Sequence, residues 1–570
     1  MKKGHYALVA AALVVLIVII MVFAIERPVQ EPVQEPVVQE PAQEPAQEPA
    51  EEPEQDLLSW QKDTSPFEFD IFFYGAWGGG YKWRGSLVEE FITEATGVTK
   101  NVIIPTGDEI QFLNVLIASG DLPDAMVLEW HSPITQQLIE AGKIHSINDL
   151  SEKYAPELMD MISEDVKLYH NHTDGELYYL PSFFMTKEEF EQSLDRHVAR
   201  PLFIQKGIFE ALGEPVIDTP DKLLEVLKEI RTKFPDVRPF SIESPLDVNQ
   251  WGLTGNLTMQ FFAGIFAPET FGRDLYLEDG QIKLIIENPN FIEAVRFLNK
   301  IYREGLISLD TLLMRHEIWG ELVDTAQIAI TGRFPIDVWR THNPRIMQLT
   351  NDEGKTYIPL VPYMRHEGKK PQFAGTRSAG WVASMVTTDA ENPKRIIRYF
   401  QYSWSDEGQI TNLFGREGET FEWVDGMPQY KPAILEEMES DPASLVNKFG
   451  FEQRLIMWRS KWAGWQRIAI APPAFTEYLK AVGQYGVDVW DLGLDNLNPD
   501  PASDEGVLYA RIRHIWNEYL AKMVLAQNDA EFDAAYEDAM NEIREAGLEE
   551  VRAVMTENHL KDVARKRGER

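Results

Sequence analysis

The chain has 570 residues, of which 91 are acidic and 54 basic, so its formal net charge is −37. A surface this acidic repels phosphate groups, which argues against nucleic acid and anionic lipid as partners. The chain contains no cysteine, which leaves no residue for disulfides, thiolate catalysis or lipid attachment through sulfur. Its length allows two or three domain-sized units with a substantial core.

Residues 7–25 form an uncharged, apolar run behind Lys2 and Lys3. A run of this length can cross a hydrocarbon core of ~30 Å as a helix, and the lysines favour a cytoplasmic N-terminus. We therefore predict that residues 1–25 are a signal anchor that tethers the rest of the chain to the extracellular face of the membrane. The alternative is a removed signal peptide and a secreted protein, because Val22-Phe23-Ala24 is an acceptable cleavage site.

Residues 26–65 follow as a predicted disordered linker. Proline recurs every four or five residues up to Asp56, between glutamine and glutamate and almost without core-forming side chains. Proline fixes φ and has no N–H, so such a segment is expected to be semi-extended and to act as a spacer.

Strand and helix patterns alternate from residue 66 onward. Strands are predicted at residues 66–74, 102–104 and 125–128, and helices at 83–95, 111–118 and 134–141. Such alternation indicates a mostly parallel sheet that is covered by helices. Residues 175–181 then resemble a hairpin-like strand that leaves this first part of the chain.

A second α/β stretch begins near residue 201. Thr219 is a good helix N-cap and Pro220 suits the first helical position, so a helix is expected at residues 221–234. Another is expected at residues 291–304, where Gly305 ends it. Further strands are predicted at residues 326–331, 356–361 and 380–386, and further helices at 393–402 and throughout 508–566.

Eight segments carry a likeness to a known family. They are LIASGDLPDAMV (116–127), GKIHSINDL (142–150), DGELYYLP (174–181), FLNKIYREGL (297–306), DTAQIAITG (324–332), SAG (378–380), YSWSDEG (402–408) and FGREGETF (414–421). In this order they resemble the extracellular solute-binding proteins of ABC importers, in the sugar-binding family that includes maltodextrin-type and alginate- or pectin-oligosaccharide-type receptors. Each motif alone is weak, but the shared order argues against coincidence.

The resemblance implies an α/β, periplasmic-binding-protein-like fold with two lobes, a hinge and a ligand cleft between them. It divides the chain into a first lobe at residues 66–182 and 357–412, and a second lobe at residues 183–356 and 413–570. It also implies a monomer that captures a carbohydrate, expected to be an oligosaccharide, by lobe closure. The captured ligand would then be delivered to ABC permease subunits in the membrane.

Two other functions remain open at this point. One is a membrane-tethered carbohydrate sensor for a signalling protein, and the other is a cell-surface polysaccharide hydrolase or lyase. A hydrolase would need two carboxylates ~5–10 Å apart across a sugar, and Glu129 beside Trp130 is the best candidate for one of them. The sequence has no GxSxG, HExxH or P-loop motif, so no catalytic residue is assigned.

No metal or cofactor is expected. Longer members of the family often carry a calcium-like loop after the helix that corresponds to residues 221–234. In this chain the sequence PDVRPF at 235–240 offers too few oxygen ligands for calcium. His170 and His172 form a tempting metal pair, but they lack an obvious third ligand.

The ligand site is predicted from aromatic side chains, because sugars stack their C–H faces on flat rings. The chain has 15 tryptophans, and several follow predicted strands, where the carboxyl ends of a sheet form a ligand crevice. The residues expected to contact the ligand are Trp77, Glu129, Trp130, Trp251, Trp339, Arg340, Arg377 and Trp381. The arginines suit hydroxyl or carboxylate groups. The alternative for any single tryptophan is a packed position in the core. For Trp458, Trp462 and Trp465 the core position and the ligand site are equally compatible with the sequence.

Overall fold

The computed structural model describes residues 57–566 with gaps. Outside the description lie residues 1–56, 75–84, 106–108, 190–200, 243–251, 333–336, 375–379, 452–456, 471–485, 488–493 and 567–570, and several shorter stretches. The expected signal anchor and most of the expected linker are therefore outside the described residues. Within the described part, no helix combines the length and the hydropathy needed to span a bilayer. Leu57–Arg570 forms one compact unit.

Regular structure is present before the predicted linker boundary at residue 65. A 3₁₀ turn, η1 (Ser59–Lys62), places Trp60 in the core, where its ring lies edge-on to Tyr402 at 4.9 Å between centroids. The reason is local composition, because the Pro/Gln/Glu repeat stops at Asp56 and an apolar Leu57-Leu58-Ser59-Trp60 segment follows. The folded unit thus begins at Leu57.

A five-stranded sheet organises the first half of the fold, with the order β2-β1-β3-β12-β4. Its strands are β1 (Phe67–Phe73), β2 (Val98–Ile103), β3 (Ala125–Glu129), β4 (Leu180–Pro181) and β12 (Val382–Val386). β1 pairs in parallel with β2 and β3, whereas β12 is antiparallel to both β3 and β4. The sheet is therefore mixed, and β12, which lies between β3 and β4, comes from far along the chain.

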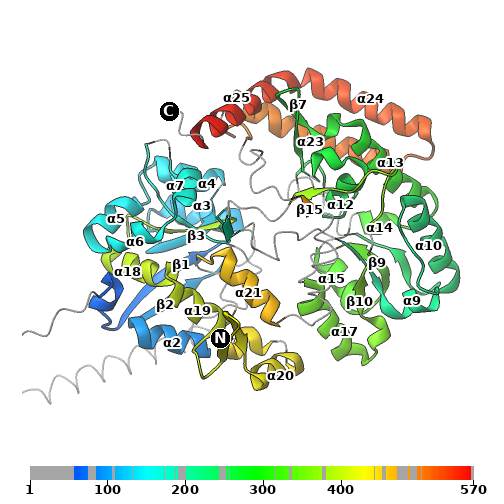
Figure 1. Cartoon of the computed structure of the whole chain (residues 1–570). Coiled ribbons are helices and arrows are strands. Elements are labelled where there is room, and N and C mark those ends of the chain that lie inside the picture. The colour runs from blue at the N-terminus through cyan, green and yellow to red at the C-terminus, as the bar shows by residue number, and fades with distance from the viewer. Residues whose placement is uncertain are drawn as a thin grey trace, which may run out of the picture. The chain divides into compact units, whose positions relative to one another are not determined.

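Helices cover this first sheet. They are α2 (Leu87–Thr96), α3 (Glu109–Ser119), α4 (Pro133–Glu140), α5 (Ile147–Tyr154), α6 (Glu157–Met161), α7 (Glu164–His170), α18 (Pro393–Trp404) and α19 (Asp406–Phe414). α2 begins with a capping box between Ser86 and Glu89 and ends at Gly97, whose φ of 71° only glycine adopts at little cost. α18 packs against α5, α6 and η1 (Figure 1), which ties a late segment of the chain to the earliest ordered one.

A four-stranded sheet with the order β10-β5-β9-β6 organises the second half. Its strands are β5 (Leu202–Gln205), β6 (Arg238–Phe240), β9 (Ile328–Gly332) and β10 (Tyr357–Pro359). The accompanying helices are α9 (Lys206–Ala211), α10 (Pro220–Lys233), α12 (Leu257–Phe266), α13 (Pro289–Arg303), α14 (Leu309–Leu312), α15 (His316–Asp324) and α17 (Asn343–Thr350), with a π-helical turn η6 (Val338–His342) before α17. A small hairpin, β7 (Leu275–Glu278) and β8 (Gln281–Leu284), precedes α13.

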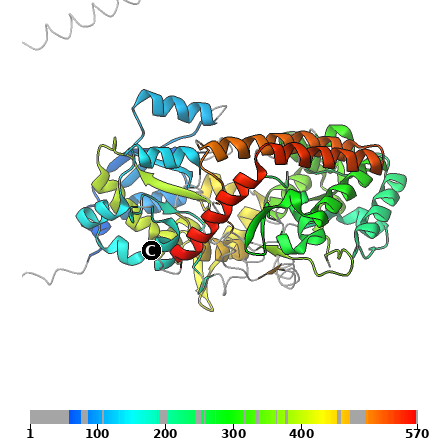
Figure 2. The ribbon, with the colours of Figure 1, turned by 90° about the horizontal axis from the view of Figure 1, so that it is seen from above.

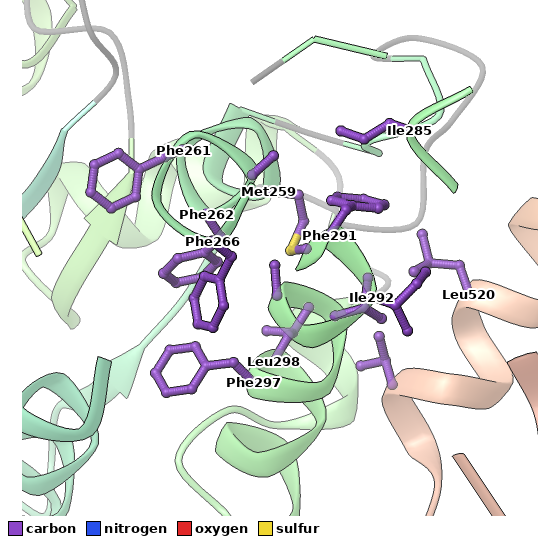
Figure 3. Close-up of a cluster of buried hydrophobic side chains, with 14 of the residues drawn as sticks. Met259, Phe261, Phe262, Phe266, Ile285, Phe291, Ile292, Phe297, Leu298 and Leu520 are labelled. Carbon is purple, nitrogen blue, oxygen red and sulfur yellow. The ribbon is translucent and has the colours of Figure 1, made fainter. Parts of the chain in front are cut away.

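Aromatic packing between α12 and α13 forms the centre of the second core. The rings of Phe262, Phe266 and Phe297 all contact one another, with centroids 5.5 to 6.5 Å apart, and all three are buried (Figure 3). Leu520 of α23 (Asp504–Leu525) borders the same cluster. Burial of such large side chains contributes roughly 1.5–3 kcal/mol each, so this cluster is a main source of stability.

Three long helices end the described chain: α23, α24 (Asp529–Glu545) and α25 (Leu548–Lys566). α23 packs along α24 and against α13, and α25 contacts β8 and α7 (Figure 2). Asn528 caps α24, and Gly547 with φ 99° separates α24 from α25. The predicted helical stretch at residues 508–566 is therefore three helices.

The described contacts divide the chain differently from the expected lobe boundaries in two places. β10, expected in the first lobe, pairs antiparallel with β5 of the second sheet. Several described residues between 413 and 470, expected in the second lobe, are buried in the cluster around the first sheet, among them Phe421, Phe451 and Trp458. Within this segment, Gln466 of α21 (Ser460–Ile470) donates its Nε2–H to the carbonyl oxygens of Leu413 and Phe451 at 3.0 and 2.7 Å. Gln409 of α19 joins the segment to the first half of the fold, because its Nε2 donates to the Met457 carbonyl at 2.8 Å. These pairings depend on burial between distant segments, which local sequence patterns do not report.

Candidate functional site

The carboxyl edge of the first sheet brings three of the predicted ligand residues together. β3 ends at Glu129, and the β3–β12 register pairs Glu129 with Val382. Trp130 directly follows Glu129 of this pair, and Trp381 directly precedes Val382. The backbone N–H of Trp130 donates to the carbonyl of Trp381 at 3.4 Å. Because β12 runs antiparallel to β3, the start of β12 meets the end of β3 at one edge.

Glu129 fixes the orientation of the Trp381 indole. The Nε1–H of Trp381 donates to Oε1 of Glu129 at 2.8 Å. Both side chains are half-buried, and a hydrogen bond to a charged acceptor contributes about 1.5–3 kcal/mol. The carboxylate therefore holds the half-buried ring at this edge, in a position to stack on a flat ligand.

Trp130, which is bonded to Trp381 through the backbone, is part of the core. The residue is only 6 % exposed, and its indole N–H donates to the carbonyl of Gly380 at 3.4 Å. Its ring meets the His170 ring edge-on, with centroids 5.0 Å apart. Trp130 therefore offers scarcely any surface to a ligand, and it contributes to the site as part of the buried core beside it.

Two backbone positions next to Trp381 adopt positive φ. Gly380 has φ 81°, and a Cβ there would lie 2.5 Å from the carbonyl oxygen of Ser182. Phe183 has φ 62°, which is unfavourable for a residue with a large side chain. The Trp381 N–H donates to the Ser182 carbonyl at 3.0 Å, so the segments before β12 and after β4 are joined where both backbones are constrained.

Phe183 is a site residue that the sequence analysis missed. Its ring lies 6.3 Å from that of Trp381 and 5.6 Å, edge-on, from that of Trp458. The Arg467 guanidinium of α21 is 5.9 Å from the same ring, at a distance that permits a cation–π contact. In the sequence, Phe183 lies shortly after the predicted strand 175–181. A search for aromatic residues after strands that included phenylalanine as well as tryptophan would have found it.

Charges around α21 are paired with one another. Arg459 forms ion pairs with Glu189 at 3.2 Å and with Asp406 at 2.5 Å. The Nε1–H of Trp462 donates to the same Asp406 at 3.3 Å. Lys461 lies over the rings of Trp462 and Trp465 at 4.8 and 5.1 Å. Trp458 and Trp462 are buried, so for these two the core position is the one the structure has.

The remaining predicted residues lie elsewhere or outside the description. Trp339 is half-buried on η6 and packs edge-on against Phe203, 6.0 Å away, at the second sheet. Arg340 belongs to the same π-helical turn. Trp77, Trp251 and Arg377 lie outside the described residues.

The histidine pair has structural partners. His170 is buried among aromatic rings, with Nδ1 3.4 Å from the hydroxyl of Tyr179. In the loop that follows, Asp174 accepts from the Tyr178 hydroxyl at 2.7 Å, and this carboxylate raises the pKa of Tyr178 to about 12. Among the described residues, no group of three His, Asp or Glu side chains is placed to hold a metal ion.

Comparison with known proteins supports the resemblance found in the sequence. No family model matches the chain. The chain is 22% identical over 335 residues to lipoprotein LipO of Bacillus subtilis, which covers 57% of this chain and 61% of LipO. It is 26% identical over 342 residues to FusA of Streptococcus pneumoniae, a fructooligosaccharide ABC transporter substrate-binding protein, which covers 58% and 60%. The match thus spans about three fifths of the length of these curated relatives.

Solved structures show the fold more completely. The alginate-binding protein AlgQ2 without calcium ion matches with a TM-score of 0.63 at 18% identity, over 88% of this chain and 99% of that one. FusA of S. pneumoniae in complex with kestose has the same TM-score and identity, over 87% and 100%. An HMO-binding, ABC-transporter-associated solute-binding protein of Bifidobacterium longum infantis reaches 0.60 at 16% identity, over 87% and 99%. The chain therefore has the α/β fold of sugar-binding solute-binding proteins, and the predicted resemblance is confirmed.

Proposed function

We propose that the chain is an extracellular solute-binding protein that captures an oligosaccharide and delivers it to an ABC-type permease. The observation that carries the proposal is the match of the fold, over nearly nine tenths of the chain, to proteins that bind alginate and fructooligosaccharide. The curated relative FusA is named as a fructooligosaccharide ABC transporter substrate-binding protein. Each of those ligands belongs to its own protein, so the sugar of this chain is open to experiment.

The arrangement of two sheets supports capture by closure. Each sheet has its own hydrophobic cluster, one around β1 and β3 and one around α12 and α13. In the proposed mechanism these are two lobes joined by a hinge, and a ligand that contacts both favours the closed state by its higher affinity for that state. The chain is proposed to act as a monomer.

The proposed ligand surface on the first lobe is formed by Trp381 and Phe183. The Trp381 ring is bonded to Glu129 and lies 6.3 Å from the Phe183 ring, and Trp130 is buried beside Trp381 with its backbone N–H bonded to the Trp381 carbonyl. Trp77, Trp251, Trp339, Arg340 and Arg377 remain proposed contacts. Glu129 is proposed to position Trp381 and to have no part in bond cleavage, so the chain is proposed to bind without turnover.

The proposed location is the extracellular face of the membrane. Residues 1–25 would be the anchor and residues 26–56 the linker, which would raise the local concentration of the receptor near its permease. The curated relative LipO is named as a lipoprotein, which supports association with the membrane. The tether of this chain would be peptide, since it has no cysteine.

The experiment is a thermal-shift screen of residues 57–570 against neutral and acidic oligosaccharides. A ligand that binds the native state raises the melting temperature, so we expect a shift with one structural class of sugar. The sugars that give a shift are then incubated with the protein and analysed for cleavage. Recovery of the intact sugar supports the receptor, whereas cleavage products would show an enzyme. No shift across the panel would contradict an oligosaccharide receptor.

A further inference from the structure

A rigid β-hairpin carries an exposed tryptophan at its tip. It consists of β13 (Phe421–Val424) and β14 (Met427–Tyr430), joined by Asp425 and Gly426 with φ values of 51° and 78°. Two successive residues with positive φ form the tight turn that matches the twist of paired strands. Such a turn leaves the tip little freedom to move.

The base of the hairpin is locked into the first core. Phe421 is buried, and the hydroxyl of Tyr430 donates to the carbonyl of Leu413. The Nε2 of Gln466 donates to the Tyr430 oxygen at 3.3 Å. Gln466 lies on α21 beside Arg467, whose guanidinium approaches Phe183. One helix therefore contacts both the hairpin base and the aromatic cluster of the candidate site.

The tip is apolar and open to solvent. Trp423 is 41 % exposed and its neighbour Val424 is 50 % exposed. Tryptophan is the residue type most enriched among side chains that dominate protein interfaces. A rigid scaffold lowers the conformational entropy that an interface must remove on binding, so this tip has the properties of a docking element.

The charge around the tip selects among partners. Residues 416–441, which run from the start of this region through α20 (Pro432–Ser440), contain eight acidic and two basic side chains. Both basic side chains are engaged. Arg416 pairs with Glu94 at 2.7 Å and with Glu419 at 3.0 Å, while Lys431 bonds the Gly418 carbonyl and lies 3.7 Å from Glu422. The exposed carboxylates of Glu422 and Asp425 directly adjoin Trp423 and Val424 in the chain, so the tip is negatively charged, which disfavours an anionic lipid surface.

We propose that the Trp423–Val424 tip docks into an apolar pocket edged by lysine and arginine on the extracellular surface of the permease. This inference rests on the proposed function. An acidic rim around an apolar anchor is complementary to such a pocket, and the charges would speed the encounter and fix its orientation.

The test compares Trp423→Ser/Val424→Ser with a matched control on a second hairpin. Leu277 of the β7–β8 hairpin is 50 % exposed, and its turn residues Asp279 and Gly280 have φ values of 51° and 77°. Leu277→Ser therefore removes an equally exposed apolar tip from the same kind of turn. The variants replace the native protein in cells, and uptake of the labelled oligosaccharide found in the thermal-shift screen is measured beside its affinity for each purified variant.

We expect unchanged oligosaccharide affinity in both variants, uptake reduced roughly tenfold or more in the Trp423 variant, and normal uptake in the Leu277 variant. Normal uptake in the Trp423 variant would overturn the docking proposal and leave the receptor intact. If the unaltered protein neither binds the sugar nor supports uptake, the proposed function fails first and the docking proposal falls with it.

A photo-crosslinker identifies the surface that the tip contacts. Benzoylphenylalanine is placed at position 423 or, as the control, at position 277 of the full chain in cells. An adduct between position 423 and a polytopic permease subunit supports the proposal. An adduct with lipid, an adduct with a second copy of this chain, or the same adducts from both positions would overturn it.

Discussion

The indole N–H of Trp381 donates to the carboxylate of Glu129 at 2.8 Å, across 252 residues of sequence. This bond joins the residue before β12 to the last residue of β3. It gives Glu129, which precedes Trp130 in the sequence, the role of a positioning residue for the distant Trp381. The first prediction follows from it.

Glu129→Leu removes the acceptor and leaves the Trp381 indole free to turn. We expect oligosaccharide affinity to fall roughly tenfold or more, since a hydrogen bond to a charged group contributes about 1.5–3 kcal/mol. Glu129→Gln keeps an acceptor oxygen and should lose much less affinity. Isothermal titration calorimetry with the sugar from the thermal-shift screen measures both, and equal affinities for the two variants would show that the bond does not position the ring.

Gly380→Ala tests the constrained backbone before Trp381. The new Cβ would lie 2.5 Å from the Ser182 carbonyl, at φ 81°, so the segment that carries Trp381 must move. Gly418→Ala is the control, because its φ is 79° but a Cβ there meets nothing within 4 Å. We expect each variant to lose about 1 kcal/mol of stability from φ alone.

Only Gly380→Ala should in addition lose oligosaccharide affinity and further stability. Urea unfolding and calorimetry on both variants separate the two effects. Matching losses in the two proteins would mean that the Ser182 contact imposes no constraint on the site.

Lys100 of β2 makes stability depend on pH. It is fully buried, its Nζ donates to the Tyr399 hydroxyl at 2.9 Å, and burial lowers its pKa well below the ordinary value, an effect that the Glu89 carboxylate opposes. Because the unfolded chain then binds the proton more tightly, this group costs stability as pH falls below its unfolded pKa of about 10.

Lys100→Met should therefore raise the free energy of unfolding by about 1–3 kcal/mol near neutral pH, as apolar replacement of buried charged groups often does. It should also flatten the rise in stability between about pH 8 and pH 10. Lys222→Met, at an exposed position of α10, serves as the control. Urea unfolding across this pH range checks both, and an unchanged slope in Lys100→Met would refute the assignment.

Arg395 of α18 bonds residues near the start of the described chain to the rest of the fold. Its guanidinium donates to the carbonyls of Asp63, Ser65 and Thr96, the last two at 2.7 and 3.2 Å. Arg395→Met leaves these carbonyls without the donor, and we expect a loss of about 1–3 kcal/mol, the cost of leaving a polar group without its hydrogen bond. Hydrogen exchange of residues 58–65 should speed up several-fold, whereas Lys394→Met, at the exposed neighbouring position, should leave it unchanged.

Elements with strong local signals were predictable from the sequence. Thr219 and Pro220 correctly indicate the start of α10, and Gly305 follows the end of α13 as expected. β4 is only Leu180–Pro181 although a strand was expected from residue 175, because the preceding residues bond to the α5 region and to their own loop, as Leu177 N–H does to Asn148. Local sequence patterns do not show that hydrogen bonds to such distant partners replace strand pairing.

The candidate site was predictable as a set of residue types near strand ends, and not as an arrangement. Glu129, Trp130 and Trp381 were named separately, but their contacts follow from the β3–β12 register, which pairs segments far apart in sequence. Trp130 and Trp381 are both tryptophans that directly adjoin a strand, Trp130 after β3 and Trp381 before β12. Only packing makes one a buried support and leaves the other half-buried.

The place of β12 has a consequence for how the chain folds. β12 lies between β3 and β4, so the first sheet cannot close until Val382–Val386 has been synthesised, long after β1, β2 and β3. Until then β3 has a free edge, and pairings of such sequence separation form slowly. A nascent chain therefore remains incompletely folded while its N-terminal half is already made, and for the proposed exported protein this interval would give an export apparatus that requires an unfolded polypeptide time to act.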